Sequence, residues 1–89
     1  MSKKSLESGE FYAAGGMLSV YFEQKSDSGE PDPALWVSSC LELASGTVCR
    51  YITQTTINTR LCVVLEIPTG VEGTHHFVAC DDEDADLLQ

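Results

Sequence analysis

Hydrophobic and polar residues alternate over residues 17–24, where Leu18, Val20 and Phe22 occupy every second position. A period of two residues places side chains of one kind on one face of a β-strand. We therefore expect a half-buried strand over residues 17–24, followed by a loop over residues 25–33, which are rich in Ser, Asp, Gly and Pro.

Two stretches rich in β-branched residues, 47–56 and 60–67, flank a short connection at residues 57–59. This pattern predicts a β-hairpin, and a last short strand over residues 75–80 is expected to pair antiparallel with residues 60–67. A turn centred on residues 57–59 pairs Ile52 with Val63 and Gln54 with Leu61, and these residues share one apolar face. The opposite face is expected to be semi-polar and carries Cys49, Tyr51, Thr53, Thr55, Arg60, Cys62, Val64 and Glu66.

Residues 33–44 fit two patterns. Asp32-Pro33 is a favourable helix start, because Asp accepts hydrogen bonds from early backbone amides and Pro has no amide hydrogen to leave unpaired. A helical face would carry Leu35, Trp36, Ser39, Cys40 and Leu43. A strand is the alternative, with Leu35, Val37, Leu41 and Leu43 on one side. The spacing, with Gly46 as a helix end, favours the helix.

The two ends of the chain are polar. Residues 1–16 form a polar N-terminal segment, in which Ser5 is placed to cap a short helix that runs to Ala14. Residues 81–89 are predicted to form an acidic C-terminal tail, which ends in the apolar pair Leu87-Leu88.

A chain of 89 residues makes one domain, because it cannot enclose two cores. We therefore predict a small α+β domain over residues 1–80, built from an antiparallel sheet of three or four strands and one packed helix at about residues 33–44.

Charge narrows the range of partners. The chain has 14 acidic and 5 basic residues, a net charge of −9, and without the run at residues 81–86 it keeps 9 acids against 5 bases. Such a surface repels nucleic acid and anionic membranes and attracts basic partners. We expect no direct nucleic-acid or membrane binding, and a basic protein surface as the partner.

The candidate partner-binding residues follow from this charge. Carboxylates in a run can imitate the phosphates of a nucleic acid, and the two leucines that follow suggest docking on the protein's own fold or on another protein. The alternative is a solvated, mobile end. Tyr21 and Tyr51 fall on the polar faces of their strands, where aromatic rings are typical of interfaces, although each ring can also cover its cross-strand neighbours. The predicted partner-binding residues are Asp81, Asp82, Glu83, Asp84, Asp86, Tyr51 and Tyr21.

The sequence supports a metal site or an active site less well than it supports partner binding. Cys49, Cys62, Cys80 and His76 could face one another across three strands, but no close ligand pair of the kind found in structural zinc sites occurs. Buried structural thiols explain the cysteines more simply. Serine, cysteine and histidine occur without a nucleophile elbow or a glycine-rich phosphate loop. We expect no enzyme activity, no catalytic residue, no metal and no cofactor.

No apolar run approaches the length of a membrane span, and the N-terminus lacks the apolar stretch of a secretory signal. We expect a cytoplasmic protein with reduced cysteines.

In charge and size the chain resembles the small acidic inhibitors of phages and mobile elements, among them anti-CRISPR proteins and nucleic-acid mimics, and also nuclease immunity proteins. The leading hypothesis is a viral or immunity-type inhibitor that occupies a basic groove of a nucleic-acid-binding or nuclease complex. The alternative is an assembly adaptor that forms a homodimer or a hetero-oligomer through its sheet or a strand edge. A third hypothesis is a metal protein or enzyme built on Cys and His.

Overall fold

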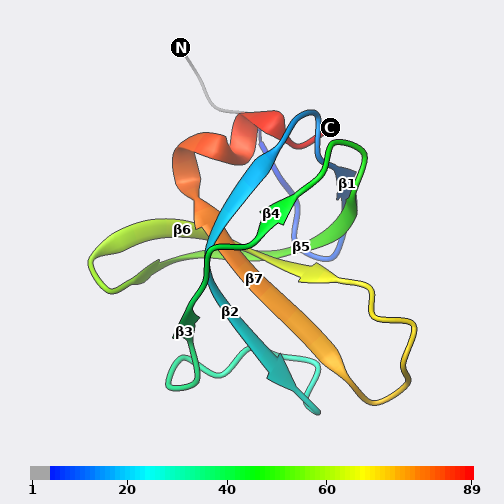
Figure 1. Ribbon diagram of the computed structural model, residues 1–89, viewed down its shortest axis with the longest axis vertical. Coiled ribbons are helices and arrows are strands. Elements are labelled where there is room, and N and C mark those ends of the chain that lie inside the picture. The colour runs from blue at the N-terminus through cyan, green and yellow to red at the C-terminus, as the bar shows by residue number, and fades with distance from the viewer. Residues whose placement is uncertain (1–4) are drawn as a thin grey trace.

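The computed structural model describes residues 5–89, which form a strongly curved antiparallel sheet and one short 3-10 helix (Figure 1). The strand order is β1-β5-β6-β7-β2-β3, and β4 pairs with β2 beside β3. The elements are β1 (Phe11–Ala13), β2 (Leu18–Ser26), β3 (Val37–Ser38), β4 (Glu42–Leu43), β5 (Val48–Ile57), β6 (Arg60–Ile67), β7 (His75–Asp81) and the 3-10 helix η1 (Asp82–Leu87).

The predicted α+β class is wrong, because the described residues contain seven strands and no α-helix that packs on the sheet. Within residues 5–89 no helix is long and apolar enough to cross a membrane. The expected strand at residues 17–24 is confirmed as β2, and the hairpin is confirmed as β5 and β6. The last predicted strand is β7, which pairs antiparallel with β6 as expected.

The predicted helix at residues 33–44 is replaced by β3 and β4. Asp32 does accept a hydrogen bond from the amide of Ala34 at 2.9 Å, but only a single turn follows it. The edge of β2 supplies other partners: the amide of Val20 donates to the carbonyl of Leu41 and the amide of Ser39 donates to that of Tyr21. Pairing with a long strand therefore overrides the local helical pattern, because tertiary contacts outweigh helix propensity.

The short helix predicted from Ser5 to Ala14 is also absent. A turn at residues 7–10 leads into β1, which pairs with residues 48–50 of β5. Residues 1–4, the start of the predicted polar segment, lie outside the described part of the chain.

The hairpin turn has two residues and not three. Asn58 and Thr59 have φ of 48° and 65°, as a type I′ turn requires, and Ile57 pairs with Arg60. Gln54 therefore faces Val63 and not Leu61 as predicted. A bulge at Ile52 shifts the register once more and bends β5.

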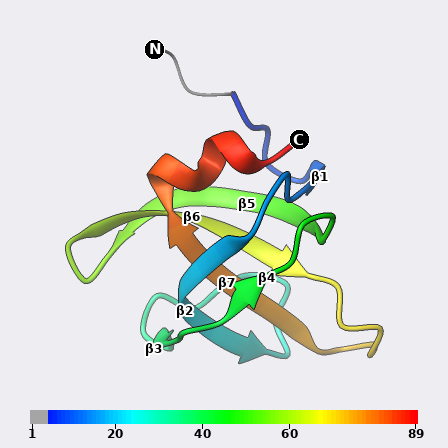
Figure 2. The same ribbon diagram turned by 45° about the horizontal axis from the view of Figure 1, so that its top comes forward.

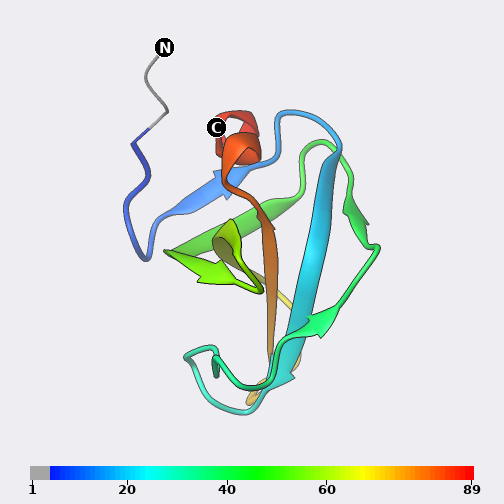
Figure 3. The same cartoon turned by 90° about the vertical axis from the view of Figure 1, so that its left-hand side faces the viewer.

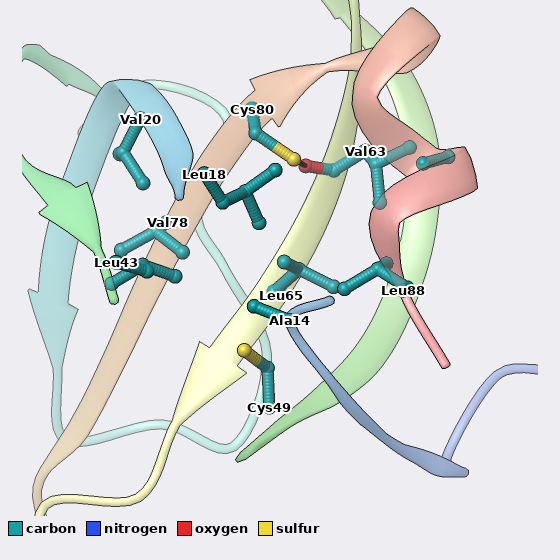
Figure 4. Close-up of a cluster of buried hydrophobic side chains, with 11 residues drawn as sticks. Ala14, Leu18, Val20, Leu43, Cys49, Val63, Leu65, Val78, Cys80 and Leu88 are labelled. Carbon is teal, nitrogen blue, oxygen red and sulfur yellow. Dashed lines mark hydrogen bonds between the residues drawn. The ribbon is translucent and has the colours of Figure 1, made fainter. Parts of the chain in front are cut away.

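The main core lies on the inner side of the curved sheet. Figure 4 shows its side chains converging from most of the strands and from the C-terminal segment. Because β6 and β7 are central, they bury side chains on both faces, so that Val63 joins the inner core and Val64 joins a second cluster on the outer face. The inner core consists of Ala14, Leu18, Val20, Leu43, Cys49, Val63, Leu65, Val78, Cys80, Ala85 and Leu88.

The C-terminal segment closes this core. Leu88 is fully buried, and the backbones of Ala13 and Gln89 exchange two hydrogen bonds of 2.9 Å. Figure 2 shows the C-terminal end of the chain near β1. The amide of Gly15 donates to the carbonyl of Leu87 at 2.6 Å. A Cβ atom at Gly15 would lie 2.8 Å from that carbonyl oxygen, so this close approach requires glycine.

Removal of the Leu88 side chain is expected to destabilise the protein strongly. Leu88→Ala should lower the free energy of unfolding by about 2–5 kcal/mol, because it leaves a cavity in the inner core. Leu61→Ala is the matched control, since Leu61 lies on a strand and is 46% exposed. Urea denaturation measures both variants, and equal losses would contradict the role of Leu88 as a core residue.

Candidate functional site

The predicted acidic tail is placed on the fold as η1, and its residues follow a period of three. Asp82, Ala85 and Leu88 are buried, whereas Glu83 and Asp86 are exposed. Residues three apart eclipse one another in a 3-10 helix, so the segment has one buried face, which includes Asp82, and one acidic face toward solvent. The leucine pair thus docks on the protein's own fold.

Asp81 and Asp82 are engaged within the molecule. One carboxylate oxygen of Asp81 accepts from the amide of Glu83 at 3.0 Å, and the other pairs with Arg60 at 3.1 Å. Asp82 is 4% exposed, and its Oδ1 accepts from the side-chain amide of Gln54 at 2.5 Å. The acids presented to solvent by η1 are therefore Glu83, Asp86 and the half-buried Asp84.

The two predicted tyrosines lie in different environments. Tyr21 is exposed, and the guanidinium carbon of Arg60 lies 4.2 Å from the centre of its ring, so that Arg60 brings Tyr21 and Asp81 together. Tyr51 is half-buried against the inner core, and burial, with a smaller contribution from Tyr12, raises the pKa of its phenol. The structure does not join Tyr51 to the Tyr21 cluster.

A cleft of about 410 Å³ opens on the outer face of the sheet. One wall is the loop between β2 and β3, which contributes Pro31, Pro33 and Trp36. The other wall is the hairpin, where the exposed Thr53 and Thr55 lie beside the buried Ile57 and Val64. An apolar floor with hydroxyl groups at its margin suits an apolar side chain of a ligand.

Gln24 holds the loop wall in place. Its side chain is 4% exposed, its Nε2 donates to the carbonyl of Asp32 at 2.9 Å, and its Oε1 accepts from the amide of Asp32 at 2.8 Å. The buried amide thus satisfies both polar groups with one backbone residue. Pro31 and Pro33 restrict the backbone on both sides of this contact. The cleft is therefore largely pre-formed.

Two carboxylates pair with the adjacent histidines of β7. Glu66 lies between Arg50, at 2.7 Å, and the Nδ1 of His75, at 2.6 Å. Burial alone would raise the pKa of Glu66, but the hydrogen bonds from His75 and Arg50 outweigh it and hold this pKa below the ordinary value. The Ser39 hydroxyl, which donates to Glu23, and then His76, which pairs with Glu23 at 2.8 Å, lower the pKa of the Glu23 carboxyl.

The order Ser39, Glu23, His76 differs from that of a catalytic triad. In a triad the imidazole lies between hydroxyl and carboxylate and removes the hydroxyl proton. Here the carboxylate lies between, and the serine donates to it. This arrangement orders β3 and β7 on either side of β2.

The cysteines that were considered as zinc ligands lie in buried positions. Cys49, Cys62 and Cys80 are free thiols in the two cores, and Cys40 is a free, exposed thiol. Burial raises the pKa of all three buried thiols, that of Cys80 to about 12, so they remain protonated near neutral pH. Among residues 5–89, no three side chains of His, Cys, Asp or Glu gather in a metal-binding arrangement.

No protein-family model matches the chain, and neither the curated proteins nor the solved structures contain a match to it. The candidate site is therefore defined by geometry alone. Sequence reasoning named Thr53, Thr55 and Val64 as a sheet face, but it missed Gln24 and the loop wall with Trp36. The cluster of Pro31 and Pro33 before a tryptophan was the available signal.

Acidification is expected to destabilise the fold through Glu66. Its folded-state pKa lies below the unfolded value, so its contribution is present above pH 4.5 and is lost as the pH falls through the lowered pKa. When the pH is lowered from about 6 to 3, the free energy of unfolding of Glu66→Gln should decrease by less than that of the wild type. Urea titration at several pH values measures this, with Glu72→Gln, an exposed loop residue, as the control. Identical pH dependence in Glu66→Gln and wild type would contradict the assignment.

Loss of the Gln24 amide is expected to loosen the loop wall. In Gln24→Ala, the backbone amide of Asp32 should exchange with solvent about five- to tenfold faster, as the loss of about 1 kcal/mol implies. Amides of β6 should keep their rates. Gln54→Ala is the control, because Gln54 contacts η1 and not the loop. Unchanged exchange at Asp32 would show that the prolines alone fix the loop.

Proposed function

We propose that this protein is a small acidic binding protein without catalytic activity, which occupies a basic surface of another protein. The observation that carries the proposal is the charge that remains after internal pairing. Of the three basic residues described, Arg50 and Arg60 are already engaged with Glu66 and Asp81.

Most of the other acids are exposed, on several loops and on η1. In η1, Glu83 and Asp86 are exposed on one face, and Glu7 and Glu10 are exposed in the segment that precedes β1. The polar contacts of the C-terminal segment and its buried leucine hold these carboxylates on a rigid support. Exposed carboxylates on a rigid support favour steering toward a cationic surface and lose little entropy when they bind it.

The most specific form of the proposal is an inhibitor that covers the basic groove of a nucleic-acid-binding or nuclease complex. A groove built to neutralise phosphates offers several Lys and Arg side chains to the exposed carboxylates of η1. Displacement of nucleic acid is then the expected consequence of binding.

Competition with DNA tests this proposal. A fluorescent duplex bound to a linker histone serves as the probe, and the protein should displace it at 50 mM salt and much less well at 300 mM, because salt screens exposed charges. The variant Glu83→Gln/Asp86→Asn should need about three- to tenfold more protein for half displacement, as expected for two exposed ion pairs.

The matched control is Glu42→Gln/Glu72→Gln, which removes two exposed charges outside η1. It should change the protein concentration needed for half displacement by less than the η1 variant does. Displacement that ignores salt, or equal shifts in both variants, would rule out η1 as the part of the molecule that contacts a basic surface.

A further inference from the structure

Within residues 5–89, the second half of β5 has one edge to which no strand is paired. β1 covers β5 only at residues 48–50, and the segment before β1 bonds to Tyr51 and to the carbonyl of Ile52. The bulge at Ile52 then turns β5 away, so that among the described residues no strand pairs with residues 53–56 on the side opposite β6. Alternate backbone N–H and C=O groups of this stretch point to that edge.

This edge lacks the features that usually prevent strand pairing. Its sequence is Thr-Gln-Thr-Thr, all four residues are exposed, and it contains no Pro and no charged residue. Exposed edges are normally protected by Lys, Pro or a covering segment. Because no described segment covers it either, this edge is available to an added strand.

The two sides of the edge differ in chemistry. Thr53 and Thr55 line the cleft beside Trp36 on the outer face. Gln54 points to the other side and donates to Asp82 of η1, next to the exposed Glu83. Figure 3 shows the hairpin between η1 above and the loop of residues 27–36 below. A cleft with an apolar floor and a polar margin thus lies on one side, and the carboxylates of η1 lie on the other.

We propose that an extended, basic segment of the partner protein adds to the edge of β5 as a further strand. Side chains of a strand alternate between its faces, so every second residue of the segment points into the cleft and the others point toward η1. The segment therefore alternates apolar residues, which contact Trp36, with Lys or Arg, which pair with Glu83. The inference rests on the proposed function and names how the basic partner is bound.

Charge complementarity favours this occupant over a second copy of the chain. A second copy would bring a further net charge of −9 to an edge that already faces η1. The loop wall carries the exposed acids Asp27, Glu30 and Asp32 beside its prolines, which adds to this repulsion. The same acids attract a cationic segment.

Designed peptides test the inference on the whole protein. The probe is an acetylated nonapeptide of alternating Lys and Val. Two controls carry the same side chains. One groups the lysines before the valines, and the other keeps the alternating order but carries N-methyl groups on alternate backbone amides, which prevents strand hydrogen bonds. The alternating peptide should bind at least about tenfold more tightly than either control, because only it combines strand bonds with both faces.

Two variants locate the bound peptide. Thr55→Lys places a positive charge at the cleft, and Ser45→Lys adds the same charge at an exposed position on the turn before β5. Thr55→Lys should weaken binding of the alternating peptide several-fold more than Ser45→Lys. NMR shifts of the wild type should be largest at the amides of residues 53–56 and at the Trp36 indole.

The outcomes separate this inference from the proposed function. Equal binding of all three peptides, with salt dependence and with shifts confined to η1, would overturn strand addition and leave the acidic binding function standing. Peptide binding that does not depend on salt concentration would overturn both strand addition and the acidic binding function. NMR shifts at residues 53–56 that depend on protein concentration in the absence of peptide would show that a second copy of the chain occupies the edge. The proposal of a basic segment would then be wrong.

Discussion

The capture of the C-terminal segment by the inner core is the contact on which the rest of the structure depends. A strongly curved sheet leaves its concave side open. Leu88, which is fully buried, and Ala85 fill this side. The backbone bonds between Ala13 and Gln89 fix the segment beside β1. Because this segment packs on the core, the acidic run folds as η1, and Glu83 and Asp86 are exposed to solvent. The same short segment therefore carries the acidic surface and covers the core, so substitutions in it can affect both.

Irregularities of two strands shape the outer face. The bulge at Ile52 bends β5, and in the part of the chain that the structure describes no strand pairs with the edge at residues 53–56. A second irregularity, between Val20 and Phe22, moves β2 from the inner core to the outer cluster, where Trp36 covers it. Gln24, two positions further, then clamps Asp32. Bulges commonly redirect side chains near functional sites, and here they create a cleft and an edge side by side.

The acids of this chain have two distinct roles. Glu23, Glu66, Asp81 and Asp82 make contacts within the fold, and the lowered pKa values of Glu23 and Glu66 show that hydrogen bonds stabilise their charged forms. The acids on loops and on the outer side of η1 face solvent. Net charge alone therefore overstates the surface that is available to a partner, and position along the chain does not separate the two groups. Asp82 and Glu83 are neighbours, but the first is buried and the second is exposed.

Local pattern was sufficient to predict β2, the hairpin and β7, because alternation and β-branched residues reflect contacts with the nearest strands. The excess of negative charge was likewise evident from composition. The prediction of a helix at residues 33–44 was wrong. One turn after Asp32 satisfies the local helix-start pattern, whereas hydrogen bonds to the edge of β2 determine the structure of the residues that follow. The cleft, the Gln24 clamp and the open edge joined residues that are distant in the sequence. Only tertiary structure could decide them, because bulges and backbone partners depend on the whole sheet and leave no periodic trace in the chain.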